Sequence, residues 1–262
     1  MTAYNTDYPV ISVRPVADET FALRFHAPEL SAALRPGQFL NILTSELYDP
    51  LLRRPYSISN VIGEECEIVF TIVGKGTALL AEKRSGDTIG VLGPLGNTFG
   101  YEKDFGTAII VAGGIGVAPF PFLVRELQRR ERSIHTFLGA RNAGRVVRDG
   151  LAGLHIATDD GSEGYHGTAV ACLDAFLDTH EPDHPRIFAC GPNPMLRATQ
   201  ELAARRGIAC ELSLESEMAC GVGICQGCPV ERTEGERKYA LVCTDGPCFD
   251  SRDIIFHEHH HA

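Results

Sequence analysis

The sequence predicts a mixed β and α/β protein in three parts: an N-terminal antiparallel β-barrel, a parallel α/β nucleotide-binding domain and a small C-terminal iron–sulfur domain. Short apolar stretches broken by Gly and Pro fill the first hundred residues, strands and helices alternate after about residue 105, and a cysteine run follows near the end. A chain of 262 residues is also at the size where one core usually gives way to two. We therefore expect domains over residues 1–100, 101–212 and 213–262.

The first region has the pattern of a small antiparallel barrel. Its apolar runs are short and are separated by turn-forming residues at Pro36-Gly37, Gly63, Gly86 and Gly93-Pro94. Barrels close such strands into a sheet without free edges. The clearest predicted strands are Phe21–Phe25, Phe39–Leu43 and Glu67–Val73.

The second region changes period. An apolar strand at 108–112 enters a Gly-rich turn and then an amphipathic helix, Phe122–Arg130. Alternation of strand and helix implies a parallel sheet, and such sheets bind ligands at the carboxyl ends of their strands. The further strands are predicted at 134–138, 154–157, 186–190 and 208–212, and the further helices at 167–179 and 194–206.

The third region holds a C-x4-C-x2-C…C run whose spacing matches a plant-type [2Fe–2S] cluster. The predicted ligands are Cys220, Cys225, Cys228 and Cys243. Glycines at 221, 223 and 227 would let the backbone curl so that its amides face the sulfurs. Fifty residues make a small core, so we expect the metal centre to stabilise this tail.

Other interpretations of the cysteines stay open. A structural zinc ion is one, although zinc pairs commonly have two to four residues between ligands. Disulfides fit poorly, because nine cysteines is an odd count and no export signal is evident. Cys248 competes with Cys243 for the fourth ligand position. The remaining cysteines, Cys66, Cys172, Cys190 and Cys210, have the scatter of small buried hydrophobes.

Two segments of the barrel suggest a flavin site. In Arg54-Pro55-Tyr56-Ser57 the guanidinium can pair with a phosphate, the aromatic ring can pack on the flavin and the hydroxyl can bond the ring edge. About twenty residues on, a strand enters the turn Gly74-Lys75-Gly76-Thr77, which suits a pyrophosphate, with Thr77 as helix cap. A pyrophosphate favours FAD over FMN. The predicted FAD contacts are Arg54, Pro55, Tyr56, Ser57, Val69, Phe70, Thr71, Gly76 and Thr77.

Two turns of the second region suggest a pyridine-nucleotide site. Each follows a predicted strand and opens a helix, the context that gives a dinucleotide motif its meaning. Cys190 would touch the reacting ring or be a buried strand-end residue. Arg141, Arg145 and Arg148 could bind a 2′-phosphate, so the choice between NADH and NADPH stays open. The predicted contacts are Gly113, Gly114, Gly116 and Pro119 in the first turn and Cys190, Gly191 and Pro192 in the second.

Bulk properties exclude some functions. A formal net charge of −10 argues against a nucleic-acid surface. No run approaches the roughly 18 apolar residues of a membrane span. The N-terminus lacks the basic and apolar segments of an export signal, so we expect a cytoplasmic protein. The His-rich end, residues 257–262, either binds metal or has no role in the fold.

The four cofactor segments, R-P-Y-S, G-K-G-T, G-G-I-G-V-A-P and C-G-P-N-P-M, resemble those of the ferredoxin–NADP reductase superfamily and occur in its order. The tail Glu217–Cys228 with Val242–Pro247 is similar to that of dihydroorotate dehydrogenase B electron-transfer subunits. The segment at 158–162 is similar too, which adds Asp159 to the predicted NAD contacts. The resemblance implies FAD in the barrel, NAD in the middle domain and [2Fe–2S] in the tail.

The predicted activity is electron transfer from NADH through FAD and the cluster to a partner. We expect no catalytic acid or base, because the protein mainly has to align nicotinamide with flavin. The resemblance implies an FMN-containing catalytic subunit of pyrimidine synthesis as partner, in a two-plus-two heterotetramer. Alternatives are a free-standing NADH-dependent reductase, a reductase subunit serving a hydrogenase or transhydrogenase, and a non-catalytic zinc-stapled module.

Overall fold

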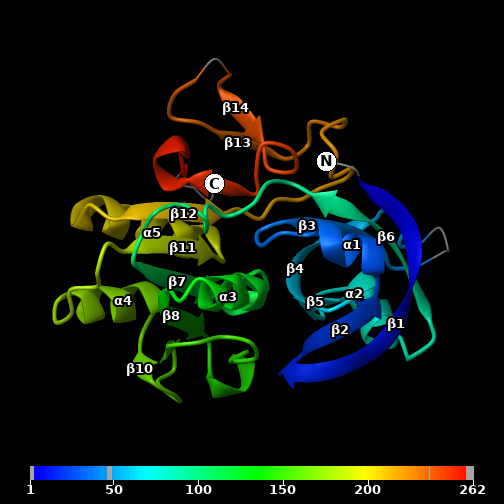
Figure 1. Cartoon of the computed structure of the whole chain (residues 1–262), viewed down its shortest axis with the longest axis horizontal. Coiled ribbons are helices and arrows are strands. Elements are labelled where there is room, and N and C mark those ends of the chain that lie inside the picture. Colours follow the sequence, from blue (N-terminus) through cyan, green and yellow to red (C-terminus); the bar gives the residue numbers. More distant parts are fainter. Residues whose placement is uncertain (1–2, 46–48, 236, 258–262) are drawn as a thin grey trace, which may run out of the picture.

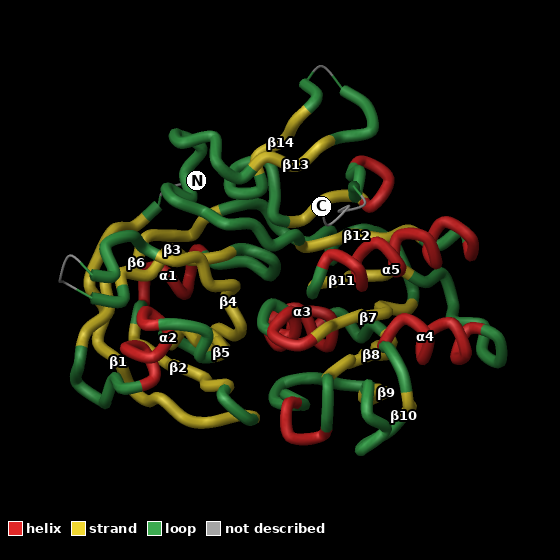
Figure 2. Tube along the Cα trace, turned by 180° about the vertical axis from the view of Figure 1, so that it is seen from behind, coloured by secondary structure: helices red, strands yellow, loops and turns green. Residues whose placement is uncertain are grey.

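The computed structural model describes residues 3–45, 49–235 and 237–257. A barrel and an open sheet lie side by side, and the C-terminal region, residues 214–257, crosses one end of both (Figure 1). The view from behind shows the same three-part arrangement (Figure 2). The predicted fold class is therefore confirmed. No helix in these described ranges is both long and apolar enough to cross a bilayer.

The barrel is closed and antiparallel. Its apolar interior includes Leu23, Phe25, Leu40 and Ile42, which alternate with outward-facing residues as the period of a strand requires. The described elements are β1 (Tyr4–Ala17), β2 (Thr20–His26), α1 (Pro28–Ala33), β3 (Phe39–Leu43), β4 (Arg54–Ile62), β5 (Glu65–Thr71), α2 (Lys75–Ala81) and β6 (Thr88–Leu95). The strands neighbour one another in the order β1-β2-β5-β4-β3-β6.

The open sheet carries helices on its two faces, as expected of alternating strands and helices. Its elements are β7 (Thr107–Gly113), η1 (Gly114–Val117), α3 (Phe120–Arg129), β8 (Ser133–Ala140), η2 (Ala143–Arg145), β9 (Leu154–Thr158), β10 (Tyr165–His166), α4 (Ala169–Leu177), β11 (Arg186–Cys190), α5 (Asn193–Arg206) and β12 (Ala209–Ser213). These strands pair with one another in parallel. The fully buried β7, flanked by β8 and β11, is the centre of the sheet.

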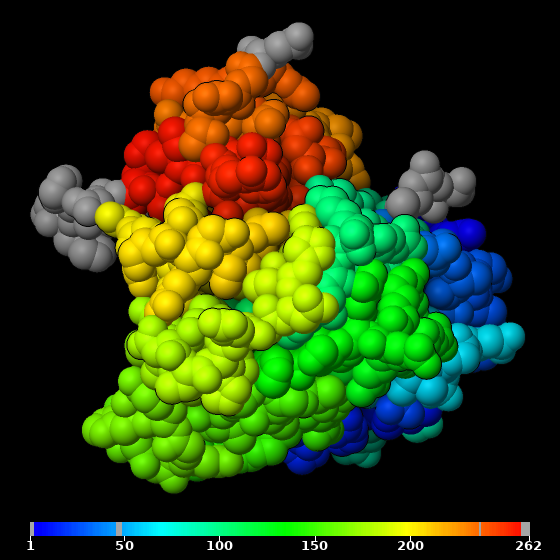
Figure 3. Space-filling model, turned by 60° about the vertical axis from the view of Figure 1, so that its left-hand side comes forward, coloured from blue at the N-terminus to red at the C-terminus, as the bar shows by residue number. Residues whose placement is uncertain are grey.

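The C-terminal region consists mostly of loops with three short strands. A hairpin of β13 (Pro229–Glu231) and β14 (Tyr239–Leu241) stands away from the sheet, and β15 (Cys248–Asp250) is followed by η3 (Ser251–Asp253). In the space-filling view this orange and red region covers the end of the molecule next to the yellow α5 and β12 (Figure 3).

Strand β15 joins the open sheet, which the sequence did not predict. It pairs antiparallel with β12, with Leu212 opposite Phe249 and Ser213 opposite Cys248. Three residues carry no hydrophobic period, so this edge strand is defined by its partner rather than by its own sequence. The division into three sequence domains remains a prediction, because the third region completes the sheet of the second.

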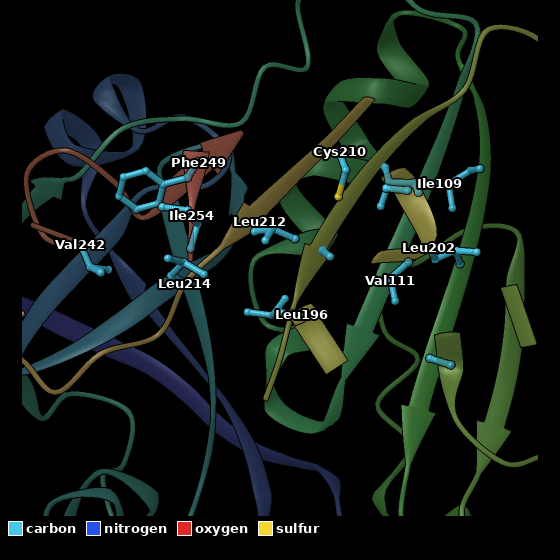
Figure 4. Packing of buried hydrophobic residues seen from close by; sticks show 14 of the residues in the cluster. Ile109, Val111, Leu196, Leu202, Cys210, Leu212, Leu214, Val242, Phe249 and Ile254 are labelled. Atoms are coloured by element: carbon cyan, nitrogen blue, oxygen red, sulfur yellow. The ribbon is translucent and has the colours of Figure 1, made fainter. Parts of the chain in front are cut away.

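One hydrophobic core runs from the sheet into the C-terminal region. Leu212, Leu214, Phe249 and Ile254 belong to the same buried cluster as the centre of the sheet, and Figure 4 shows their side chains close together. Cys210 lies in that cluster, where burial raises the pKa of its thiol to about 12. The C-terminal region is thus held by apolar packing as well as by strand pairing.

Candidate flavin, nucleotide and iron–sulfur site

A cleft of about 480 Å³ opens where the three regions meet. All nine residues predicted to contact FAD line it, on β4, on β5 and at the start of α2. Its walls are apolar with a few convergent polar groups, the usual character of a cofactor site. The structure therefore brings together two sequence segments that were identified separately.

The chain around Gly76 fits a cofactor that needs close approach to the backbone. A Cβ built on Gly76 would lie 2.9 Å from Nε of Arg54 and 3.2 Å from Oγ1 of Thr44, so a larger residue would push the Arg54 side chain away from α2. Arg54 is half-buried and lines the cleft. A guanidinium beside exposed backbone amides suits the phosphates of FAD.

Thr77 takes part in capping α2, but from inside the helix. Helix α2 begins at Lys75 after Gly74, so Gly74 is the N-cap residue and Thr77 lies in the first turn. Its Oγ1 reaches back and accepts hydrogen bonds from the backbone amides of Val73 at 2.9 Å and Gly74 at 3.2 Å. Glycine has no side chain with which to cap the helix, so the threonine closes the turn from within.

Several residues of the cleft were not predicted. Ser213–Ser216 and Met218 come from the segment that leaves the carboxyl end of β12. Their position at that edge of a parallel sheet was the signal that could have found them. Gly74 and Lys75 of the predicted pyrophosphate turn also line the cleft, and the other unpredicted lining residues are Phe39, Asp49, Pro50, Val73, Ile115, Ala118 and Pro247.

The two predicted nucleotide turns touch one another. They follow the adjacent parallel strands β7 and β11. A Cβ on Gly116 would lie 2.3 Å from the carbonyl oxygen of Cys190, and one on Gly191 would lie 3.1 Å from the amide nitrogen of Gly113. Ile115 and Ala118 of the first turn also line the flavin cleft. A nucleotide at these turns would therefore border the flavin.

The helix after the first turn does not start as predicted. The turn runs into the 3-10 segment η1, and α3 begins at Phe120, directly after Pro119, rather than at Phe122. Asp159 follows β9, two strands away from β7, where its amide donates to the carbonyl oxygen of Ala140 at 3.1 Å. It thus lies at the same edge of the sheet as the two turns.

Cys190 and the candidate phosphate-binding arginines also have defined surroundings. Cys190 is 2% exposed and packs in the core, and burial raises the pKa of its thiol. Arg145 forms an ion pair with Glu19 at 2.6 Å, and Arg148 forms one with Glu163. Two of the three arginines predicted for a 2′-phosphate are therefore engaged with carboxylates.

The four predicted cluster cysteines lie as two pairs. Backbone amides and the Cys225 side chain lower the pKa of the Cys220 thiol, and burial and the Cys228 side chain raise the pKa of the Cys243 thiol, so the members of each pair are close enough to interact. Two pairs are what a [2Fe–2S] cluster requires, since each of its two irons binds two thiolates. Among the described residues, no three His, Cys, Asp or Glu side chains are grouped as ligands of a single metal ion.

The loop after Cys220 is shaped to hold a thiolate. The backbone amides of Val222 and Cys225 both donate to Sγ of Cys220 at 3.4 Å. These donors lower the pKa of the Cys220 thiol to about 6. Gly221 and Gly223 have φ of 69° and 82°, which only glycine adopts readily. Gln226, not the predicted Gly227, supplies the third left-handed position.

Cys248 is a packing residue. It is 7% exposed and lies in a core cluster with Phe99 and Phe188, between barrel and sheet. Burial raises the pKa of its thiol. The pairing of Cys243 with Cys228 favours Cys243 as the fourth ligand. The His-rich end lies outside the described residues except for His257, whose Nε2 is 2.7 Å from Oε2 of Glu231.

The cluster loop begins beside the flavin cleft. Met218 lines the cleft, and Cys220 follows two residues later. Two residues span at most about 7 Å of extended chain. A flavin in the cleft and an iron bound to Cys220 would thus be near neighbours, which is the geometry that single-electron transfer requires.

Comparison with known proteins agrees with this arrangement. The family model for the iron–sulfur cluster binding domain of dihydroorotate dehydrogenase B matches residues 215–255. The electron transfer subunit of dihydroorotate dehydrogenase B (NAD(+)) from Bacillus caldolyticus is 38% identical over 254 residues, covering 94% of this chain and 96% of its own. The chain belongs to this family. The family's subunit from Desulforamulus reducens is 35% identical over 258 residues, covering 95% of this chain and 98% of its own.

Solved structures place the family's electron transfer subunits in a wider fold group. The NADH-dependent reduced ferredoxin-NADP oxidoreductase superposes with a TM-score of 0.83 at 27% identity, over 95% of this chain and 89% of that one. A ferredoxin NADP+ reductase from Neisseria gonorrhoeae with bound FAD and NADP shares the fold, with a TM-score of 0.66 at 19% identity over 82% of this chain and 95% of that one. The resemblance predicted from the four cofactor segments is confirmed.

Proposed function

We propose that this chain takes electrons from NADH and delivers them through FAD and a [2Fe–2S] cluster to the catalytic subunit of a dihydroorotate dehydrogenase B. One observation carries the proposal: a single cleft is lined by the flavin residues of the barrel, by Ile115 and Ala118 of the nucleotide turn, and by Met218 next to the cluster loop. Flavin, when bound, accepts electrons as a pair and gives them up singly.

Each region supplies contacts to one group. The nine predicted cleft residues would hold FAD, with Arg54 on the phosphates. The touching turns at Gly113–Pro119 and Cys190–Pro192, with Asp159, would bind NAD. Cys220, Cys225, Cys228 and Cys243 would hold the cluster. The chain's own task is alignment and exclusion of water, because none of these steps requires a protein acid or base.

The partner is proposed from the family. The relatives are named as electron transfer subunits, which implies a catalytic subunit beside them. We propose that this subunit carries FMN, that it interconverts dihydroorotate and orotate, and that two copies of each subunit form a heterotetramer. Free thiols and an iron–sulfur cluster suit a reducing compartment, so we propose residence in the cytoplasm.

Anaerobic purification tests this function directly. The protein alone should contain FAD, iron and acid-labile sulfide, and NADH should bleach the flavin absorption. Co-expression with the catalytic subunit of the same organism should give a stable complex with equal amounts of both chains. A colourless protein that contains zinc, or flavin that NADH does not reduce, would contradict the proposal.

A second partner is favoured by one comparison. The structure at 27% identity is that of an NADH-dependent reduced ferredoxin-NADP oxidoreductase, a protein of flavin-based electron bifurcation. A chain of the present fold can therefore serve a different catalytic subunit. Purification of the tagged chain from its own organism distinguishes the two: recovery of a dihydroorotate-oxidising flavoprotein supports the first partner, and recovery of another oxidoreductase supports the second.

A further inference from the structure

The outward face of β3 connects the flavin cleft to the cluster loop. Leu40 and Ile42 point into the barrel core, so Phe39 and Asn41 point away from it. Phe39 lines the flavin cleft. Asn41, two residues further along the same face, is 2% exposed and contacts the cluster loop. One strand thus meets both redox sites.

Asn41 makes a specific contact with the first cluster cysteine. Its Nδ2 donates a hydrogen bond to the carbonyl oxygen of Cys220 at 3.0 Å. A Cβ on Gly221 would lie 2.1 Å from that Nδ2, so the contact depends on the glycine. The barrel side chain is therefore packed directly against the peptide that joins Cys220 to Gly221.

This contact fixes the direction of the loop. The carbonyl of Cys220 is held towards the barrel, and Gly221, at φ 69°, turns the following chain back. The amides of Val222 and Cys225 then face Sγ of Cys220. Hydrogen bonds to the sulfurs are one of the main determinants of the reduction potential of an iron–sulfur cluster.

The choice of asparagine is not explained by stability. Its Oδ1 is buried, and among the described residues it has no hydrogen-bond partner, which costs free energy. A leucine has the same branched shape with no polar atom to leave unpaired on a buried strand. A buried polar group that is only half satisfied calls for a reason other than packing.

We propose that Asn41 is a positioning residue that sets the reduction potential of the cluster from the flavin-binding barrel. It acts through the carbonyl of Cys220, by holding the loop in the turn that directs amides at the Cys220 sulfur. The inference rests on the proposed function, since it requires that the four cysteines bind a [2Fe–2S] cluster.

The test is the midpoint potential and the electron paramagnetic resonance spectrum of the reduced cluster in the purified holoprotein. Asn41→Leu removes the hydrogen bond while keeping the branched shape of the side chain. We expect a lower midpoint potential and altered g values, because amide donors stabilise the reduced, more negative cluster. Thermal stability should change little, since removal of the unpaired oxygen offsets loss of the bond to the Cys220 carbonyl. A merely structural role would not separate these two readouts.

Two control variants sharpen the result. Asn60→Leu replaces an asparagine by leucine on β4. There Oδ1 of Asn60 accepts a hydrogen bond from the adjacent Val61 amide at 2.9 Å. Asn97→Ala loosens the C-terminal region at its other end, where Nδ2 of Asn97 donates to the carbonyl oxygens of Asp245 and Cys248. Neither should alter the potential or the g values of the cluster.

Every outcome decides the proposal. A wild-type potential and spectrum in Asn41→Leu would overturn it. Loss of the cluster from Asn41→Leu alone supports it, whereas loss from both Asn41→Leu and Asn97→Ala would show that attachment of the region is all that matters. A wild-type protein without iron or flavin would instead refute the proposed function.

Discussion

Two adjacent arginines show how position along a strand separates function from packing. Arg54 lines the flavin cleft. Arg53, one residue earlier, turns across the barrel and donates to the carbonyl oxygen of Gly90 at 2.7 Å and to Oδ1 of Asn5 at 2.9 Å. The two side chains have the same chemistry and different surroundings. Comparing variants of Arg54 and Arg53 therefore isolates the contribution of the cleft arginine to FAD binding.

We predict that Arg54→Ala weakens FAD binding by about 1.5–3 kcal/mol, the usual value of a charge-assisted hydrogen bond. That is roughly a 10- to 150-fold increase in the dissociation constant. Fluorescence of released FAD measures it. Arg53→Ala should leave FAD affinity near the wild-type value and lower the melting temperature instead. Equal FAD affinity in wild type and Arg54→Ala would remove Arg54 from the site.

The cluster cysteines allow a similar contrast. We predict that Cys225→Ser abolishes cluster assembly, because it removes the exposed one of the four thiolates. FAD content and its reduction by NADH should survive, since the cleft is built from other residues. Iron and sulfide analysis with absorption spectra checks both. Cys172→Ser, on α4 away from the loop, should retain the cluster. Flavin that NADH no longer reduces in folded Cys225→Ser would contradict this division of labour.

Among the helices and strands, those with a strong hydrophobic period were predictable from the sequence. The strand at Phe39–Leu43 and the strand at 186–190 occur with the predicted bounds, and the helix predicted at 194–206 begins one residue earlier, at Asn193. Their apolar runs and flanking turns carry the information locally. Strand β15 carries none, because its pairing with β12 depends on contacts between distant segments. The same reason hides Asn41, whose partner lies 179 residues away.

The site was predictable to the same extent. Cysteine spacing and glycine-rich turns are local signals. The cluster loop and the two nucleotide turns could therefore be predicted from the sequence. The segment Ser213–Ser216 has no motif, yet it lines the cleft because β12 ends at the sheet edge that faces the barrel. Such residues line the site because of their position in three dimensions, so they can be identified only once the fold is known.

Strands β8 and β9 and helix α4 share a histidine cluster that makes their packing sensitive to pH. Nδ1 of His135 lies 3.1 Å from Nε2 of His155, and both rings pack against Phe176, which stacks on His180. Burial, together with repulsion from the neighbouring histidines, lowers the pKa of both His135 and His155. The folded protein therefore favours their neutral forms.

We predict that stability falls on acidification. Above the unfolded pKa of about 6.5 the two states bind protons equally. Below it the unfolded chain takes up protons that the folded cluster resists, so the free energy of unfolding decreases until the lowered folded values are reached. Urea unfolding between pH 8 and pH 5 measures this slope. The double variant His135→Asn, His155→Asn should flatten it, while His184→Asn, at an exposed left-handed position, should not. An unchanged slope in the double variant would refute the role of the pair.

Taken whole, the molecule is three regions that are joined by buried polar contacts as well as by apolar packing. The segment leaving the barrel contributes the amide of Gly100 and the ammonium of Lys103, which bind Glu211 of β12 at 2.7 Å and 2.9 Å. Arg186 of β11 binds the same carboxylate at 2.7 Å. Burial would raise the pKa of Glu211, but these donors outweigh it and lower the pKa. The Glu211 carboxylate thus connects the segment that leaves the barrel to strands β11 and β12 of the sheet.

A small change at Glu211 should therefore have a strong effect on the stability of the protein. Glu211→Gln keeps the shape but leaves the 11%-exposed side chain of Arg186 without its counter-charge. Breaking a buried pair in this way costs about 3–5 kcal/mol, so we predict that much loss in the free energy of unfolding. Glu201→Gln, which breaks an exposed pair with Arg197 on α5, should cost less than about 1 kcal/mol. Denaturant unfolding of both variants checks the contrast.

Because the Glu211 carboxylate also orients the barrel against the sheet, hydride transfer from NADH to flavin should slow in Glu211→Gln and not in Glu201→Gln. Equal stability of the two variants would show that apolar packing alone sets the arrangement.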